Sequence, residues 1–157
     1  MLFHVSIDAH DPQRVATVLA ELFGGAATPF PPVIEGSWVA HAGDDRNTLV
    51  EVYPRNTELV EAEGDADGFG MPGAVRGGSS THFAMATPLD EDEVHAIARR
   101  EGWTSKYRKR GGAFGVIEVW IEGDRMIEVL THDMQREYLD AMRLPVWQAM
   151  LAQGAPA

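Results

Sequence analysis

The feature that most constrains the fold of this chain is an internal repeat. Two segments, "FHVSIDAHDPQRVATVLAELFGG" and "HFAMATPLDEDEVHAIARREGW", each run from a short alternating strand into an amphipathic helix. We expect the first helix to begin after Asp11, a good N-cap residue, and the second to begin at a capping box formed by Asp90 and Glu93. A glycine follows the apolar pattern of each helix and is expected to end it.

Three strand-like runs follow each helix. They are expected at about 27–34, 36–42 and 47–54 in the first half, and at about 103–109, 114–122 and 125–131 in the second. The sequence therefore predicts an α+β fold made of two βαβββ modules, residues 1–54 and 79–132. Residues 55–78 lack periodicity and are interpreted as a linker or flap, and 133–153 as a C-terminal helix capped by Asp133.

Length and composition limit the class of protein. A chain of 157 residues is expected to form a single domain, 1–157, and its net charge of −11 argues against a nucleic-acid surface. No run approaches the roughly 20 apolar residues of a membrane span, and the first residues make a poor signal peptide. We therefore expect a cytoplasmic protein with neither nucleic-acid nor membrane partners. Without cysteine, any metal would be held by His, Asp, Glu, backbone or water.

Strand alternation sorts the side chains into an apolar face and a polar face. The polar faces of the first and last strands carry His4, Glu51, His82 and Glu128, and the His-to-Glu spacing is nearly the same in both halves. Imidazole and carboxylate ligands suit one divalent ion such as Ni, Co, Zn, Mn or Fe. The alternative is a buried polar network in which His–Glu hydrogen bonds hold the two halves together.

Four more side chains on these faces are candidate substrate contacts, namely His41, Tyr53, Glu118 and Trp120. A single repeat offset relates His41 to Glu118, and both could instead line a solvated rim. Trp120 could also fill the core or form a dimer contact. The basic run "KYRKR" could attract an anionic substrate or protect an exposed edge strand from aggregation.

The paired modules with His4, Glu51, His82 and Glu128 resemble the vicinal oxygen chelate superfamily. This group includes glyoxalase I, fosfomycin- and bleomycin-resistance proteins, methylmalonyl-CoA epimerase and extradiol dioxygenases. The resemblance covers roughly residues 1–54 and 79–132 and implies a cup-shaped mixed sheet around a metal held by these four residues. The ligand set is most similar to that of glyoxalase I. The chain departs from glyoxalase I at Asp8, in a stretch where an Arg is usual.

The resemblance implies a metal-dependent enzyme and a homodimer. Its divalent ion would chelate two neighbouring oxygens of a small organic substrate, and Glu51 or Glu128 would move a proton α to a carbonyl. This is lyase or isomerase chemistry through an enediolate-like intermediate. One alternative is a metal-free small-molecule (drug) binding protein of the bleomycin-resistance type. Another is an Fe(II) ring-cleaving dioxygenase.

Overall fold

The computed structural model describes residues 4–30, 33–45, 47–60, 68–75, 81–143, 145–146 and 148–149. The chain divides into two compact units, Met1–Thr81 and His82–Ala157, and each is considered by itself. Their boundary lies close to the start of the second predicted module.

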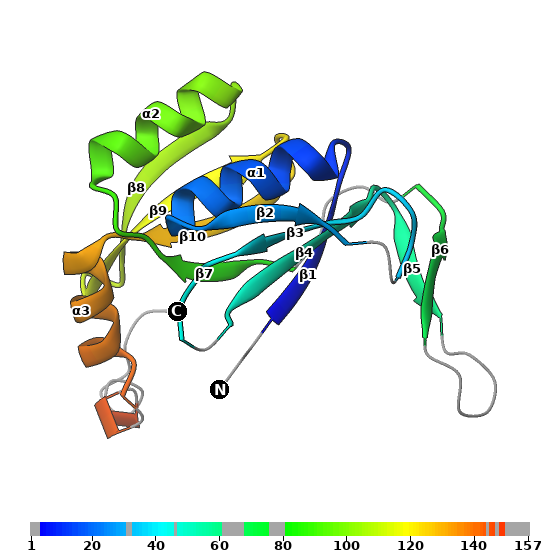
Figure 1. Ribbon diagram of the computed structural model, residues 1–157. Coiled ribbons are helices and arrows are strands. Elements are labelled where there is room, and N and C mark those ends of the chain that lie inside the picture. Colours follow the sequence, from blue (N-terminus) through cyan, green and yellow to red (C-terminus); the bar gives the residue numbers. More distant parts are fainter. Residues whose placement is uncertain are drawn as a thin grey trace. The chain divides into compact units, whose positions relative to one another are not determined.

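The first unit contains a four-stranded mixed sheet and one helix (Figure 1). The elements are β1 (His4–Ala9), α1 (Pro12–Phe23), β2 (Ala26–Pro29), β3 (Trp38–His41) and β4 (Leu49–Pro54). The strands lie in the order β1-β4-β3-β2. The first and last strands, β1 and β4, are parallel, and the other neighbours are antiparallel.

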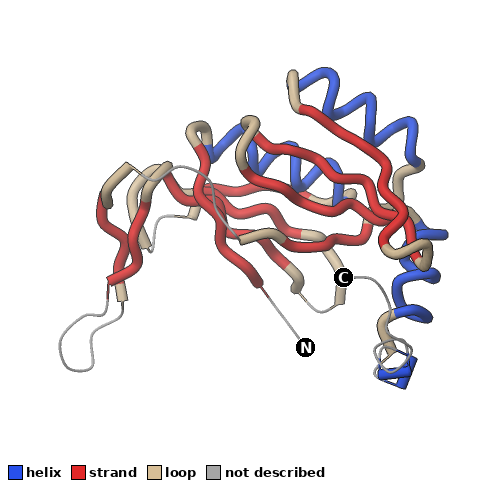
Figure 2. The backbone as a smooth tube through the Cα atoms, turned by 180° about the vertical axis from the view of Figure 1, so that it is seen from behind, coloured by secondary structure: helices blue, strands red, loops and turns tan. Residues whose placement is uncertain are grey.

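The second unit repeats this connectivity. Figure 2 shows the strands and helices from behind. The elements of the second unit are β7 (Phe83–Ala86), α2 (Glu91–Glu101), β8 (Thr104–Arg110), β9 (Phe114–Ile121), β10 (Arg125–Leu130) and α3 (His132–Ala141). The order is β7-β10-β9-β8, again with the first and last strands parallel. The predicted α+β fold with two βαβββ modules and a C-terminal helix is confirmed.

Local chemistry explains where the first two helices begin and end. The Asp11 side chain accepts a hydrogen bond from the Arg14 amide, and Asp90 and Glu93 make both bonds of a capping box. Gly24 and Gly102 end the helices in the left-handed conformation, with φ of 75° and 76°. These cap residues agree with the prediction.

The core of each unit lies between the sheet and its helices. In α1, Val15, Leu19 and Leu22 are almost completely buried, and the helix contacts all four strands of its sheet. In the second unit, alternate residues of β9 and β10 such as Ile117 and Ile127 are equally buried, because they lie on the strand faces that form the core; on β10 this face also carries the buried Arg125. The opposite strand faces are left for polar side chains.

The segment expected to be a linker or flap contains two short strands. β5 (Thr57–Val60) and β6 (Phe69–Pro72) pair antiparallel and form a separate two-stranded sheet (Figure 1). Their sequences lack the apolar-polar alternation that identifies a half-buried strand, so these two strands were not predicted from the sequence. The rest of the predicted linker includes 61–67 and 76–78, which lie outside the described residues.

The C-terminal helix begins earlier than expected. Thr131 is the N-cap residue of α3, although within the described residues its side chain makes no cap hydrogen bond. The predicted cap, Asp133, is wrong: it lies in the first turn, 2.6 Å from the Arg136 guanidinium. The last part of the predicted helix, from Met150 on, lies outside the described residues.

None of the helices described here is long and apolar enough to cross a membrane.

Replacing Leu19 with Ala should destabilise the first unit by about 2–5 kcal/mol, because a large buried side chain leaves a cavity when it is shortened. Urea denaturation would measure the free energy of unfolding. Gln13→Ala, at an exposed position of the same helix, is the control and should change it by no more than about 0.5 kcal/mol. Equal effects of the two substitutions would contradict the proposed core.

The contacts of Glu137 should make the stability of α3 packed against the sheet depend on pH. Its carboxylate accepts hydrogen bonds from Lys109 Nζ at 2.7 Å and from the Gly115 amide at 2.8 Å, and these contacts lower the pKa of Glu137. A carboxyl group whose pKa is lower in the folded state stabilises the fold above its unfolded pKa, and this stabilisation is lost as the pH falls through the folded value.

Denaturation of the wild type and Glu137→Gln between pH 7 and pH 2 would check this. The variant should be the less stable protein at pH 7, and the difference should shrink in acid. Asp140→Asn, on the same helix, is the control and should alter the pH profile less, because among the described residues the Asp140 carboxylate forms an ion pair only with Arg143, at 3.9 Å. A difference between Glu137→Gln and the wild type that does not vary with pH would contradict the role of Glu137.

Candidate metal and substrate site

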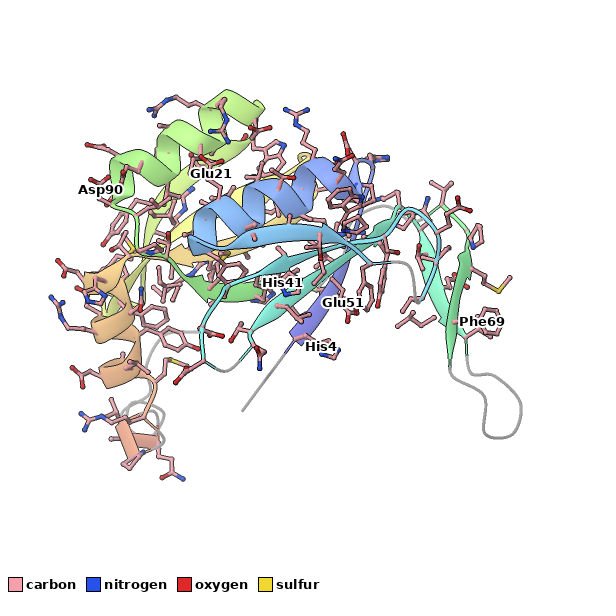
Figure 3. The ribbon with its side chains drawn as sticks, in the orientation of Figure 1. His4, Glu21, His41, Glu51, Phe69 and Asp90 are labelled. Atoms are coloured by element: carbon pink, nitrogen blue, oxygen red, sulfur yellow. The ribbon has the colours of Figure 1, made fainter. Side chains whose placement is uncertain are left out.

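In the first unit, His4 and Glu51 lie on neighbouring parallel strands. The register pairs His4 with Leu49 and Ser6 with Glu51, so that His4 and Glu51 share a face and are one diagonal step apart. Figure 3 shows both side chains together with His41 of β3. His4 is exposed and Glu51 is partly buried.

The second unit places His82 and Glu128 in the same relation. Glu128 of β10 pairs with Ala84 of β7, and His82 lies two residues before Ala84, as His4 lies two residues before Ser6. His82 directly precedes β7 and is exposed. Each module thus presents one imidazole and one carboxylate in matching register, which the repeat spacing in the sequence already indicated.

Tyr53 holds one oxygen of Glu51. The phenol hydroxyl donates a hydrogen bond to Oε2 of Glu51, and Tyr53 is itself buried, with 6% of its surface exposed. Burial, the hydrogen bond and the negative charge of Glu51 together raise the pKa of Tyr53, so the phenol stays protonated and can donate at neutral pH. Tyr53 was predicted to contact substrate, and the contact that the structure gives it is with Glu51.

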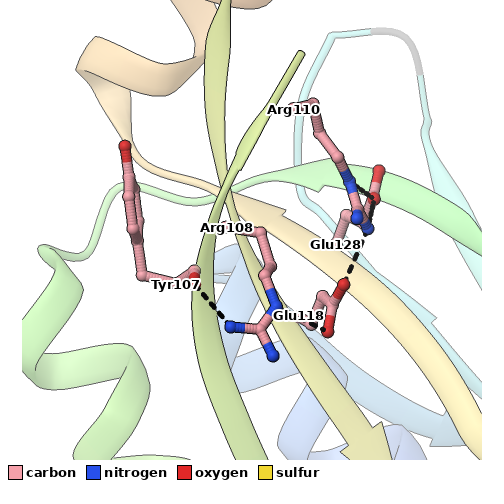
Figure 4. Close-up of polar contacts among 5 residues, drawn as sticks. All are labelled: Tyr107, Arg108, Arg110, Glu118 and Glu128. Atoms are coloured by element: carbon pink, nitrogen blue, oxygen red, sulfur yellow. Dashed lines mark hydrogen bonds and ion pairs between the residues drawn. The ribbon is translucent and has the colours of Figure 1, made fainter. Parts of the chain in front are cut away.

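Glu128 belongs to a cluster of charged side chains on one face of the second sheet (Figure 4). Glu118 and Glu128 are directly opposite each other on antiparallel strands, an arrangement that is destabilising for two like charges. Arg110 lies between them, with Nε 3.0 Å from Oε1 of Glu128 and Nη2 2.8 Å from Oε1 of Glu118. The hydrogen bond with Glu128 is the main cause that raises the pKa of Arg110.

Arg110 was not among the site residues predicted from the sequence. It ends the "KYRKR" run, and the strand was expected to stop one residue earlier, at 109. β8 is an edge strand, as one interpretation of this run proposed. In the extended β8 strand, Lys106, Arg108 and Arg110 share the face that pairs with Glu118, and this alternation is the signal that could have placed Arg110 at the site.

The remaining candidates lie on the same faces but differ in their surroundings. His41 Nε2 is 3.2 Å from the Thr28 hydroxyl, and Trp120 is partly exposed opposite Met126.

The expected equivalence of His41 and Glu118 is wrong. Glu51 pairs with Val39 on β3, whereas Glu128 pairs with Glu118 on β9, and so Val39 is the counterpart of Glu118.

Asp8, where the chain departs from glyoxalase I, has a structural contact. Its Oδ2 accepts a hydrogen bond from the Asn56 amide at 2.8 Å and lies 3.8 Å from Nε of Arg55. Asn56 has a φ of 62°, in the left-handed region that most residues avoid. Asp8 therefore stabilises the tight turn between β4 and β5.

The second unit also has a hollow on its other side, with a volume of about 510 Å³. It lies between the start of α2, Tyr107 of β8 and the start of α3. Tyr107 pairs with buried Ile117, on the face opposite to that of Glu118. This hollow is therefore separate from the charged cluster of Glu118 and Glu128.

The predicted ligands fit a divalent ion by the chemistry of their donor atoms. Imidazole nitrogen and carboxylate oxygen are ligands of Ni, Co, Zn, Mn and Fe. In the described part of the chain, no hydrogen bond or ion pair reaches Oε1 of Glu51 or Oε2 of Glu128, so each carboxylate keeps one oxygen available. No group of three or more His, Asp and Glu side chains among the described residues is arranged to hold a metal.

Removal of the Tyr53 hydroxyl should destabilise the protein by about 1.5–3 kcal/mol, the range for a hydrogen bond to a charged group. Denaturation of Tyr53→Phe would measure this change in the free energy of unfolding. Tyr138→Phe removes a hydroxyl for which the described residues provide no hydrogen bond, and this control should have little effect. Equal losses in the two variants would contradict the Tyr53–Glu51 bond.

Comparison with known proteins supports the fold. No family model matches the chain, and no curated protein matches it significantly in sequence. Among solved structures, lactoylglutathione lyase from Agrobacterium tumefaciens aligns with a TM-score of 0.54 and 14% identity, over 85% of this chain and 94% of that one. Glyoxalase I from Leishmania major aligns with a TM-score of 0.52 and 18% identity, over 99% of both chains.

A fosfomycin-resistance protein from Listeria monocytogenes is similar to the same degree. Its TM-score is 0.54 at 12% identity, and the alignment covers 87% of this chain and 97% of that one. These similarities extend over both modules and almost the whole length of each neighbour. The chain therefore has the fold of glyoxalase I and the fosfomycin-resistance proteins, and the resemblance to the vicinal oxygen chelate superfamily is confirmed at the level of the fold.

Proposed function

We propose that this protein is a divalent-metal-dependent enzyme that acts on a small organic molecule bearing two neighbouring oxygens, by lyase or isomerase chemistry. One observation carries the proposal. Both modules place a His and a Glu on the same face, one diagonal step apart across the parallel pair of first and last strands. If the His and Glu side chains only stabilised the fold, the same pair would not be required in the same register of both modules.

The four proposed ligands are His4, Glu51, His82 and Glu128. A metal ion held by imidazole and carboxylate would act as a Lewis acid on two adjacent substrate oxygens. The neighbours with this fold include a lactoylglutathione lyase and a glyoxalase I, which supports small-molecule chemistry of this class.

The chain's own carboxylates would move the proton. Glu51 and Glu128 each have one oxygen held by a neighbour, Tyr53 or Arg110, and one that receives no hydrogen bond or ion pair from the described residues. The held oxygen fixes the orientation of the group, and the other can accept a proton α to a substrate carbonyl. His41 and Trp120, on the same faces, are the proposed substrate contacts.

A homodimer is part of this proposal, because the resemblance to the superfamily implies it. Leu59, Phe69 and Met71 of the β5–β6 pair are exposed apolar side chains that such an association could cover. Sedimentation of the purified protein would measure its mass in solution.

A metal-free binding protein for small molecules is the second candidate, and the Arg110 guanidinium favours it. This cation already forms an ion pair with Glu128, so the carboxylate has a charge partner without any metal. Such a protein would bind its ligand without performing chemistry.

The metal content of protein purified without chelator distinguishes the two candidates. We expect about one divalent ion per chain in the wild type, since the repeat provides one set of four ligands. His82→Ala and Glu51→Ala should each lose most of the bound metal and remain folded. The matched control is His10→Ala, an exposed histidine outside the proposed ligand set, which should retain the metal.

Two outcomes would contradict the proposal. A wild type that binds no divalent ion, even after one is added, would support the metal-free binding protein. Equal metal content in His82→Ala and His10→Ala would show that the ligand set is wrong.

A further inference from the structure

We propose that Arg110 is a positioning residue for Glu128, which holds one carboxylate oxygen so that the other can bind a divalent ion. This inference rests on the proposed function, because it assigns a role toward the proposed ligand Glu128. It assigns no contact between Arg110 and the substrate.

The first support is the geometry of the contact. Both Nε and Nη2 of Arg110 point to the same oxygen, Oε1 of Glu128, while no hydrogen bond or ion pair from a described residue reaches Oε2. A carboxylate held through one oxygen loses rotational freedom and still keeps a lone pair for a ligand. Residues that hydrogen-bond to metal ligands in this way orient those ligands and raise metal affinity.

The second support is the balance of charge around Glu128. A guanidinium beside a metal ligand would repel a cation if its charge were unopposed. Arg110 is shared between Glu128 and Glu118, which lies directly opposite Glu128, so its positive charge is divided between two carboxylates. Arg110 therefore offsets only part of the charge of Glu128 while it orients the carboxylate.

The third support is the limited access of water to this cluster. The side chains of Glu118 and Glu128 are only 12% and 13% exposed, whereas that of Arg108 on the same strand face is 47% exposed. An ion pair in such surroundings is screened less than one at the surface. Arg108 lies 3.7 Å from Glu118 and, among the described residues, makes no hydrogen bond or ion pair with Glu128, so it supplies a matched comparison on the same strand.

The test compares the wild type, Arg110→Met, Arg110→Lys and Arg108→Met. Titration of metal-free protein with Co²⁺ gives the dissociation constant, and the visible spectrum of bound Co²⁺ reports the ligand geometry. We expect Arg110→Met to weaken binding by about 10- to 100-fold and to alter the spectrum, because Glu128 is no longer oriented. Arg108→Met should stay within about threefold of the wild type and keep its spectrum, because no contact to Glu128 is removed.

Arg110→Lys is the second variant, and it keeps the inference testable if Arg110→Met fails to fold. Lys keeps the positive charge between the two carboxylates but lacks the planar fork that engages Oε1 through two nitrogens. Its Co²⁺ affinity should lie between those of the wild type and Arg110→Met, or near the latter.

The outcomes separate this inference from the proposed function. If the wild type binds Co²⁺ and both Arg110 variants bind it as tightly or more tightly, Arg110 is a competing cation and the inference is overturned, while the metal site stands. If Arg108→Met weakens binding as much as Arg110→Met, the effect belongs to the general charge of β8 and the inference fails. If the wild type binds no Co²⁺, the proposed function fails, and the inference fails with it.

Discussion

The parallel pairing of the first and last strand in each module is the constraint on which the rest of the structure depends. Parallel neighbours cannot be joined by a tight hairpin, so a helix and two further strands intervene between β1 and β4, and between β7 and β10. The same pairing sets the register of His4 with Glu51 and of His82 with Glu128. A slip of one residue would move one partner of each pair to the opposite face.

The two faces of each sheet divide structural and chemical roles. The helices cover side chains such as Val52 and Ile127, and this burial stabilises the units. The opposite faces carry carboxylates that need partners, because an unpaired charge with little access to water is unfavourable. Tyr53 meets this need in the first unit with a neutral hydroxyl, and Arg110 meets it in the second with a full charge. The two modules share a backbone plan and differ in how they support their glutamates.

Local signals in the sequence predicted much of the fold. Cap residues and glycines mark α1 and α2 correctly, since the groups that cap a helix lie within a few residues of its ends. The start of α3 was misplaced because Thr131 and Asp133 are both suitable cap residues. The β5–β6 pair was missed because its strands are short and their stability depends on each other, which no single segment reveals.

The sequence by itself determined the repeat, the strand faces and the four proposed ligands, because periodicity and spacing are properties of a single segment or of two copies of it. Only the tertiary structure decided which residues support those ligands. Arg110 is 18 positions from Glu128 along the chain and joins it because β8, β9 and β10 lie side by side in one register. Val39, rather than His41, is the counterpart of Glu118 for the same reason. Registers between strands are relations among separate segments, and the pattern within one segment does not contain them.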